Sequence, residues 1–275
     1  MLRITRYGDV IRFDLARTLA GRGRYWTTCY WLDGVLIDSG CAYTANELQQ
    51  ALSELPLKCI VNTHSHEDHI GANGRLQRER SPLDIFAHPL ALPVLTDPRK
   101  EQPLHPYRRL FWGWPEPSYG RPLADGEVIE SERYRLQVIY TPGHSPDHLC
   151  LYEPDRGWLF SGDLFVGGRE RALRRGYDIW GILASLKRIA DLPLIVLFPG
   201  SARVRQNPAD EIRAKIDYLE GMGEKVLELH RRGWNPARIA RHLFGGPMWV
   251  ELITMGDFSR EHLVRSYLSE SVERS

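Results

Sequence analysis

The sequence predicts a layered α/β protein with mixed β-sheets, and three observations support this fold class. Hydrophobic residues make up 43% of the 275 residues, which is enough for a large core and excludes a wholly disordered chain. Short β-prone runs alternate with segments that have helical hydrophobic spacing. Some neighbouring strands are joined by tight turns, and such hairpins belong to mixed rather than purely parallel sheets.

The first sixty residues contain mainly strand and turn patterns. Residues 25–32 and 35–37 flank the turn signal Asp33-Gly34, so we expect them to form a β-hairpin. Residues 58–63 form another short β-prone run. This run predicts a strand whose end delivers the chain to His64.

A helix is expected over residues 44–55, where apolar side chains recur at helical spacing. Thr44 and Glu47 are placed to form a capping box at its start, and Pro56 would stop it. Beyond it the two patterns continue to alternate. The predicted helices are 74–80, 90–95 and 182–192, and the predicted strands are 83–87, 135–140, 149–152, 158–160 and 194–198.

Two segments depart from this alternation. Residues 98–122 are rich in proline and aromatic residues, which predicts an insertion that forms a lid or wall over a site, or else a subunit interface. From Pro208 onward the pattern is almost wholly helical, with helices expected over 208–231, 236–243 and 259–269. We therefore predict a main domain over residues 1–206 and a small helical subdomain over residues 207–275.

Charge and cysteine content narrow the range of partners. The 36 basic and 35 acidic residues give a net charge of +1, so nucleic acid is a disfavoured partner, although a local basic patch stays open. No apolar run approaches the roughly 18 residues of a membrane span, and no secretory signal is visible. The four cysteines are scattered without a C-x-x-C pair, which predicts reduced thiols and a cytoplasmic protein.

One string concentrates chemical groups: Thr63-His64-Ser65-His66-Glu67-Asp68-His69. Histidine is the commonest metal ligand near neutral pH, and aspartate adds a hard oxygen. In an extended backbone His64 and His66 share a side and could hold one ion, while Asp68 and His69 reach a neighbouring one. A single loop histidine is usually a surface residue, but four ligand-type side chains in six positions favour a metal site.

Two later turns supply further ligand-type residues. Thr141-Pro142-Gly143-His144 places His144 at a strand end, and Ser161-Gly162-Asp163 does the same for Asp163. Either turn alone would be as well explained by ordinary structure. Together with the first string they complete two ligand sets.

The order H-x-H-x-D-H, T-P-G-H and S-G-D resembles the metallo-β-lactamase superfamily, in particular its glyoxalase II-like branch with a helical C-terminal extension. The resemblance covers roughly residues 20 to 205. It implies a four-layer αβ/βα sandwich with the site at one edge, between the two sheets. It also implies that His64, His66 and His144 hold a first metal, that Asp68 and His69 hold a second, and that Asp163 bridges both.

One position departs from the family pattern. Hydrolytic members usually end a later strand with P-G-H, whose histidine completes the second site, but this chain has Pro199-Gly200-Ser201. Serine is a poor ligand beside imidazole, so we expect the second site to be weaker than the first. His148, four residues after His144, is expected to support the site rather than bind metal.

The resemblance implies a metal-dependent hydrolase. The cofactor would be zinc, as one or two ions, with iron or manganese as alternatives. A metal-activated hydroxide would attack a small ester, thioester or lactone, with Asp68 as both ligand and orienter of the nucleophile. Two other functions stay open. One is a phosphodiesterase or ribonuclease of the same superfamily. The other is a mononuclear iron oxygenase or a weakly active metal-binding protein, because Ser201 replaces the histidine that usually completes the second site.

The expected partner is a small molecule, with no membrane partner and with a homodimer left open. Residues 167–175 contain four arginines and follow Asp163 closely, so they are expected to leave the site along its rim. Arginine binds carboxylates and phosphates well, so this segment would favour an anionic substrate if it faces the site. A solvated loop is an equally good reading.

Overall fold

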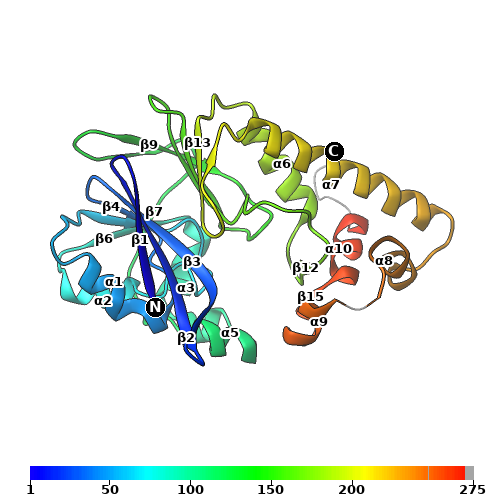
Figure 1. Cartoon of the computed structure of the whole chain (residues 1–275), viewed down its shortest axis with the longest axis horizontal. Coiled ribbons are helices and arrows are strands. Elements are labelled where there is room, and N and C mark those ends of the chain that lie inside the picture. The colour runs from blue at the N-terminus through cyan, green and yellow to red at the C-terminus, as the bar shows by residue number, and fades with distance from the viewer. Residues whose placement is uncertain (247, 270–275) are drawn as a thin grey trace.

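Two β-sheets packed face to face form the centre of the computed structural model, which describes residues 1–246 and 248–269 (Figure 1). The first sheet has seven strands in sequence order: β1 (Leu2–Tyr7), β2 (Val10–Leu19), β3 (Arg22–Leu32), β4 (Val35–Ile37), β5 (Cys59–Val61), β6 (Asp84–Ala87) and β7 (Arg121–Pro122). The second has the order β14 (Arg205–Gln206), β13 (Val196–Pro199), β11 (Trp158–Gly162), β10 (Leu149–Glu153), β9 (Arg135–Tyr140) and β8 (Val128–Glu130).

Both sheets are mixed, as predicted. Strands β1 to β4 are antiparallel neighbours, whereas β4 to β7 run parallel. In the second sheet β8 to β11 are antiparallel, and β13 lies parallel to β11. The predicted hairpin is confirmed: Leu32 pairs with Val35, and Asp33 and Gly34 both take positive φ angles in the turn.

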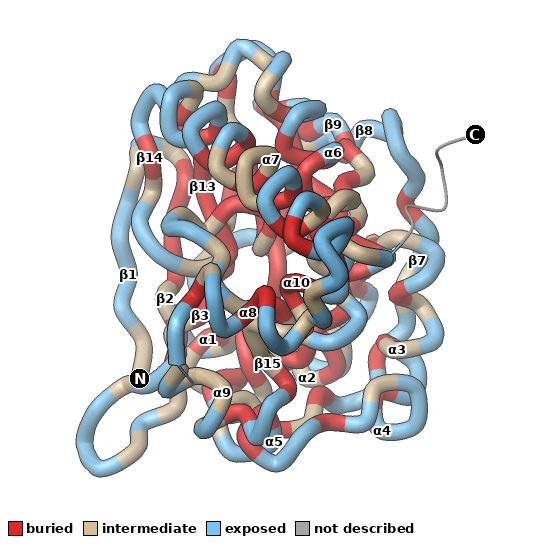
Figure 2. Tube along the Cα trace, turned by 90° about the vertical axis from the view of Figure 1, so that its right-hand side faces the viewer, coloured by how far each residue is buried: buried red, intermediate tan, exposed pale blue. Residues whose placement is uncertain are grey.

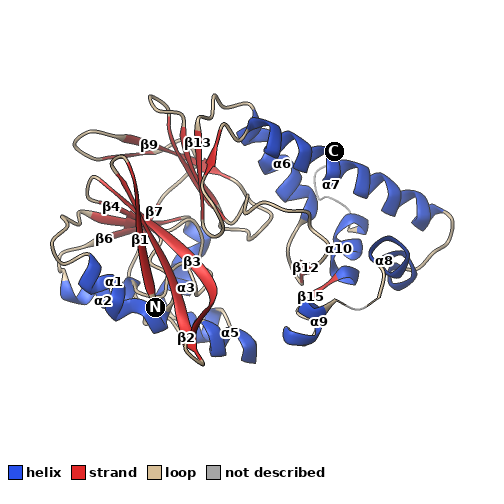
Figure 3. Ribbon diagram, viewed as in Figure 1, coloured by secondary structure: helices blue, strands red, loops and turns tan. Residues whose placement is uncertain are grey.

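Alternation of side chains along the strands divides the core into layers. In β5, Val61 belongs to the core between the two sheets, while its neighbour Ile60 belongs to the core under the outer helices. In β10, Leu151 points between the sheets and Cys150 points to the opposite face. Because successive strand residues face opposite sides, each sheet supports two apolar layers, and the predicted four-layer αβ/βα sandwich is confirmed (Figure 3).

The helices that cover the first sheet are shorter than the sequence suggests. The predicted 44–55 helix is a 3₁₀ turn (Ala42–Thr44) followed by α1 (Ala45–Ala51), so Pro56 does not terminate it. The expected cap is wrong, because Thr44 is buried and its hydroxyl donates to the Cys41 carbonyl instead of accepting from the helix. Two further short helices belong to this layer, α2 (Asn73–Glu79) and α3 (Leu92–Thr96).

The proline- and aromatic-rich insertion forms two short helices, α4 (Pro98–Glu101) and α5 (Pro106–Phe111), before the edge strand β7. Each helix has a proline at its beginning, where a missing amide hydrogen costs nothing. In Figure 1, α5 and α9 (Trp249–Ile253), a short helix from the C-terminal region, both lie along the lower side of the molecule. The insertion thereby approaches the C-terminal part of the chain.

The outer face of the second sheet is covered by α6 (Ile179–Ala190), and the C-terminal helices pack against α6 and against one another beyond it (Figure 1). Residues 208–231, which were predicted to be helical, form a single 23-residue helix, α7 (Ala209–Arg231), and α8 (Pro236–Phe244) and α10 (Arg260–Leu268) follow it. Helix α9 was not predicted. These helices share one hydrophobic cluster with α6 and the second sheet, and the division at residues 206 and 207 stays a prediction.

A small two-stranded sheet ties the C-terminal region back to the sandwich. Strand β12 (Leu173–Arg174) pairs with β15 (Phe258–Ser259) in antiparallel register. Figure 2 shows buried chain at the centre of this region and exposed chain on its outer turns. The four cysteines are buried free thiols, and none of the helices in the described residues is long and apolar enough to cross a membrane.

Candidate metal centre

The predicted ligand residues follow the ends of several strands and meet at one place. His64, His66, Asp68 and His69 lie in the loop after β5, His144 follows β9, and Asp163 follows β11. Five of these six residues line a cavity of about 230 Å³, and His64 lies behind it as a fully buried side chain. The structure therefore brings together every residue of the predicted ligand set.

Three imidazole nitrogens converge on one point. His64 Nε2 lies 2.9 Å from His66 Nδ1, which lies 3.1 Å from His144 Nε2. A tetrahedral zinc ion with bonds of about 2.0–2.1 Å would hold its nitrogen ligands about 3.3 Å apart. The observed spacing needs only a small expansion to accept such an ion.

The hydrogen-bond network assigns the tautomer of His64. The hydroxyl of Thr63 donates to Asp38 Oδ2 at 2.8 Å, so its oxygen accepts from His64 Nδ1 at 3.0 Å. Nδ1 then carries the proton, and Nε2 presents its lone pair to the convergence point. The same reasoning applies to His69, whose Nδ1 contacts Asp38 Oδ2 at 2.7 Å and whose Nε2 faces the cavity.

Asp163 stands between the two predicted ligand sets. Its Oδ2 lies 3.6 Å from His69 Nε2 and 3.6 Å from His144 Nε2, and Asp68 Oδ2 lies 3.9 Å from His69 Nε2. Asp163 Oδ1 is buried and has no hydrogen-bond partner among the described residues. A buried oxygen of this kind calls for a missing partner, and a cation next to converging imidazole lone pairs fits that role.

Charges around the cluster divide its histidines into two classes. Burial, reinforced by neighbouring imidazoles, lowers the pKa of His64 well below its usual value and lowers that of His144 to about 3. Burial also favours the neutral form of His69, but Asp38, Asp163 and Asp68 outweigh it and raise its pKa well above normal. His64 and His144 are therefore neutral, the form that binds a metal ion, whereas the acidic side chains around His69 attract positive charge.

Asp38 is a residue of the site that was not among the predicted site residues. It lies directly after β4 with a positive φ of 61°, and its carboxylate accepts from the Thr63 amide and hydroxyl as well as contacting His69. Such carboxylate partners fix the orientation and tautomer of metal-binding histidines. The signal was present in the string Asp38-Ser39-Gly40 at the end of a strand.

His148 occupies the supporting place expected for it. Its Nε2 lies 3.1 Å from the amide nitrogen of Asp163, and its Nδ1 lies 2.8 Å from the Thr141 hydroxyl. The amide must donate, so Nε2 accepts and Nδ1 carries the proton. Both ring nitrogens are thereby used within the protein, and neither is available to a metal ion.

Ser201 also reaches the cavity. Gly200 packs so closely that an added Cβ would lie 2.6 Å from Asp163 Oδ1 and 2.8 Å from His69 Cε1. Ser201 follows it in the cavity lining, and its hydroxyl makes no hydrogen bond to a described residue. The position that a histidine holds in the resembling family is therefore beside the predicted second site.

The wall of the cavity comes from several distant parts of the chain, among them residues 25–27 of β3 and Phe258 of β15. The insertion contributes Tyr107, Arg108 and Trp112, so it forms a wall as predicted, while Arg174 and Tyr177 come from the arginine-containing segment and the residues after it. Within that segment Arg174 faces the cavity. Arg171, from the same segment, does not line the cavity, and its guanidinium donates to the Phe244 carbonyl.

A buried carboxylate from the C-terminal region holds this wall together. Asp257 Oδ2 accepts from the Tyr107 hydroxyl at 2.7 Å and from Arg174 Nε at 3.1 Å. Arg174 Nη1 in turn lies 3.3 Å from His66 Nε2, and the Tyr177 hydroxyl lies 3.4 Å from His144 Nε2. The C-terminal region thereby reaches the metal centre through one intervening side chain.

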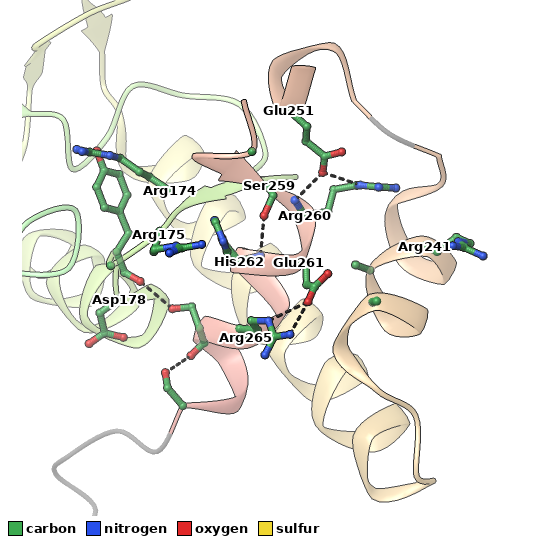
Figure 4. Close-up of a pocket in the computed structure, with 17 residues that line it drawn as sticks. Arg174, Arg175, Asp178, Arg241, Glu251, Ser259, Arg260, Glu261, His262 and Arg265 are labelled. Carbon is green, nitrogen blue, oxygen red and sulfur yellow. Dashed lines mark hydrogen bonds and ion pairs between the residues drawn. The ribbon is translucent and has the colours of Figure 1, made fainter. Parts of the chain in front are cut away.

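A second and larger cavity, of about 960 Å³, adjoins the first (Figure 4). Arg174 and Tyr177 line both cavities. Figure 4 shows that Arg260 is turned to Glu251 and Arg265 to Glu261, with closest contacts of 2.8 and 2.5 Å. Much of the positive charge of the second cavity is therefore neutralised locally.

A model of the metallo-β-lactamase superfamily matches residues 27–201. The chain belongs to this superfamily. The matched range contains every residue of the predicted ligand set, and the predicted class of metallo-β-lactamase-fold hydrolase is confirmed at the level of the superfamily.

Curated relatives match over parts of their length. The chain is 29% identical over 146 residues to a hydroxyacylglutathione hydrolase of Legionella pneumophila, covering 52% of this chain and 48% of that protein. It is 25% identical over 197 residues to an atrochrysone carboxyl ACP thioesterase of Aspergillus fumigatus, covering 70% of this chain and 55% of that protein. The chain thus spans about half the length of these two relatives.

Solved structures share the fold. A metallo-β-lactamase family protein from Thermus thermophilus, TTHA1429, superposes with a TM-score of 0.65 at 21% identity, covering 94% of this chain and 90% of that one. The protein TTHA1623, solved in a di-iron-bound form, is 31% identical with a TM-score of 0.55, covering 71% of this chain and 96% of that one. The first likeness extends over nearly the whole chain.

Proposed function

We propose that this protein is a metal-dependent hydrolase of a small thioester or ester. The observation that carries the proposal is the convergence of His64, His66 and His144 beside a second group containing His69 and Asp163, at the bottom of a cavity that a small molecule can enter. The names of the hydroxyacylglutathione hydrolase and the thioesterase favour acyl transfer to water over phosphodiester cleavage.

Six side chains would hold the metal. We assign His64, His66 and His144 to a first ion, Asp68 and His69 to a second, and Asp163 to both. The donor set contains nitrogen and oxygen but no sulfur, which suits zinc, iron or manganese. The similarity to a protein solved in a di-iron-bound form is the reason to test iron beside zinc. A bound divalent ion would lower the pKa of a water molecule to about 7 and polarise the scissile carbonyl.

The protein's own groups would position the reacting atoms. Asp68 lines the cavity and can accept and orient the proton of the attacking water, the catalytic role that we assign to it. Burial raises the pKa of the Tyr177 hydroxyl, so it stays protonated and can donate to the oxygen on which negative charge develops. His148 and Asp38 would keep Asp163 and His69 in place through the hydrogen bonds described above.

We place the reaction in the cytoplasm, because the four thiols are free and buried rather than paired. The substrate would be a small molecule, and the enzyme could act as a monomer or a homodimer. A substrate longer than the 230 Å³ cavity could extend past Arg174 and Tyr177 into the larger one.

The proposal is tested by assaying purified protein that has been loaded in parallel with zinc, iron or manganese. A thioester, a carboxylic ester, a lactone, a phosphodiester and RNA are compared at equal concentration. We expect kcat/KM to be highest for the thioester or ester and to fall to background after treatment with a chelator. Faster cleavage of the phosphodiester or RNA, or activity that survives chelation, would contradict the proposal.

A further inference from the structure

Two guanidinium groups line the metal cavity, and one of them has an unused donor. Arg108 of α5 pairs through Nη2 with Glu67, and both side chains are almost completely buried. Its Nη1 is buried without a hydrogen-bond partner among the described residues. Arg174 reaches the cavity from β12, with its side chain 15% exposed.

Structural pairing alone does not account for Arg108. Taking two charges out of water costs several kcal/mol for each ion, and their attraction offsets this only when the remaining donors and acceptors are satisfied. Here Arg108 Nη1 and Glu67 Oε1 both lack partners. A buried guanidinium that keeps an unused donor beside a ligand cavity is suited to binding an acceptor from the ligand.

Arg174 shows a similar need for an acceptor. If His66 binds a metal through Nδ1, its Nε2 carries the proton. Arg174 Nη1 lies 3.3 Å from that nitrogen, so two donors would face each other. An anionic oxygen in the cavity, beside both nitrogens and within hydrogen-bond distance of each, would accept from both, whereas a neutral methyl or methylene group would leave both unsatisfied.

Other arginines near the site are directed elsewhere. Arg171 donates to the Phe244 carbonyl, Arg169 lies over the Tyr218 ring at 5.3 Å, and Arg260 pairs with Glu251. Among the described residues that line the metal cavity, Arg108 and Arg174 are the two arginines, and there is no lysine. The positive charge available to a substrate in this cavity is therefore confined to its wall.

We propose that Arg108 and Arg174 bind a carboxylate on the acyl part of the substrate. The substrate class would be the monothioester or monoester of a small dicarboxylic acid, with its free carboxylate a few bonds from the scissile carbonyl. The planar forks of the guanidinium groups suit a carboxylate, and the 230 Å³ cavity suits a short acyl chain. This inference rests on the proposed hydrolase function and names its substrate class.

Binding can be measured without turnover. Calorimetry on the zinc-loaded protein compares succinate with butyrate, two acids of similar size that differ by one carboxylate. We expect succinate to bind about 10- to 100-fold more tightly, the range of a hydrogen bond to a charged group. Arg174→Gln should remove most of this difference, and Arg171→Gln, from the same segment but outside the cavity, should keep it.

A second variant addresses Arg108, whose removal alone would leave Glu67 buried and unpaired. The charge-neutral pair Glu67→Gln/Arg108→Gln should also reduce the preference for succinate, with its fold checked by circular dichroism. Equal binding of succinate and butyrate by the wild type would overturn the inference. Tighter competition by inorganic phosphate than by succinate would overturn the assignment of a carboxylate.

Kinetics separate this inference from the proposed function. Succinyl and butyryl thioesters of the same thiol are compared, and we expect kcat/KM to favour the succinyl compound about 10-fold or more in the wild type but not in Arg174→Gln. Chelator-sensitive hydrolysis of both thioesters without preference would leave the hydrolase standing and reject the carboxylate site. Arg174-dependent succinate binding without any hydrolysis would reject the hydrolase and keep the anion site.

Discussion

The floor and the wall of the metal cavity are built in different ways. The floor consists of ligand-type residues at strand ends, and two of its histidines, His64 and His69, are held by hydrogen bonds to Thr63 and Asp38. The wall consists of side chains from the insertion and from β12, joined through Asp257 of the C-terminal region. The floor supplies the candidate metal ligands, whereas the wall supplies the side chains that would contact a substrate.

The largest expected effect is on the floor. His66→Ala removes one of three converging imidazoles, so metal affinity should fall by more than the roughly 10- to 100-fold typical of losing an outer hydrogen-bond partner. Metal analysis after dialysis measures this loss. His230→Ala, on α7 and outside the cavity lining, is the matched control, and an unchanged metal content in His66→Ala would contradict the ligand assignment.

A smaller effect is expected from the residue that orients His69. Asp38→Asn removes the charge that raises the pKa of His69 and allows the wrong tautomer, so affinity for the second ion should fall about 10- to 100-fold. Titration with a chromophoric competitor would resolve the two ions. Equal weakening of both sites would show that Asp38 supports the fold of the whole floor instead.

Ser201 tests whether the floor is short of one ligand. Ser201→His should add an imidazole beside Asp163 and raise the metal affinity of the second site about 10-fold. This is the lower end of the effect on metal affinity that a hydrogen-bond partner of a ligand typically has. Ser201→Ala serves as the control for loss of the hydroxyl. Two equally tight ions in the wild type, unchanged in the histidine variant, would show that the second site is complete without it.

The wall should respond in KM rather than in metal content. Asp257→Asn weakens the hold on Tyr107 and Arg174, so KM should rise about 3- to 10-fold while metal stoichiometry stays the same. Steady-state kinetics with metal analysis on the same preparation separate the two quantities. A loss of metal in this variant would mean that floor and wall are not independent.

The smallest expected effect concerns the aromatic insertion. Trp112 lines the metal cavity, whereas Trp114 lies in a separate depression near Arg99. Trp112→Ala should raise KM about 2- to 5-fold through lost contact with substrate, and Trp114→Ala should leave KM unchanged. If Trp114→Ala alters the oligomeric state in sedimentation while both variants keep their KM, the insertion serves as an interface instead.

Sequence reasoning succeeded where the pattern was local. The hairpin around Asp33-Gly34 and the ligand-rich loop after β5 were both readable, because turn chemistry and strand ends leave signals within a few residues. It failed at the capping of α1, where burial of Thr44 redirected its hydroxyl to Cys41. It also left open which arginines of residues 167–175 face the cavity, because a run of arginines does not reveal which of them turns inward.

By itself, the sequence determined the family and predicted a set of candidate metal ligands that the structure brings together. Six ligand-type residues stand in three short motifs, and each motif is fixed by the strand that precedes it. Only the tertiary structure decided the wall, because Arg108, Arg174 and Asp257 are separated by more than sixty residues at each step and share no periodic pattern. These residues meet because the insertion and the pairing of β12 with β15 place three distant segments beside the same cavity. Long-range packing of this kind leaves no local signal in the sequence.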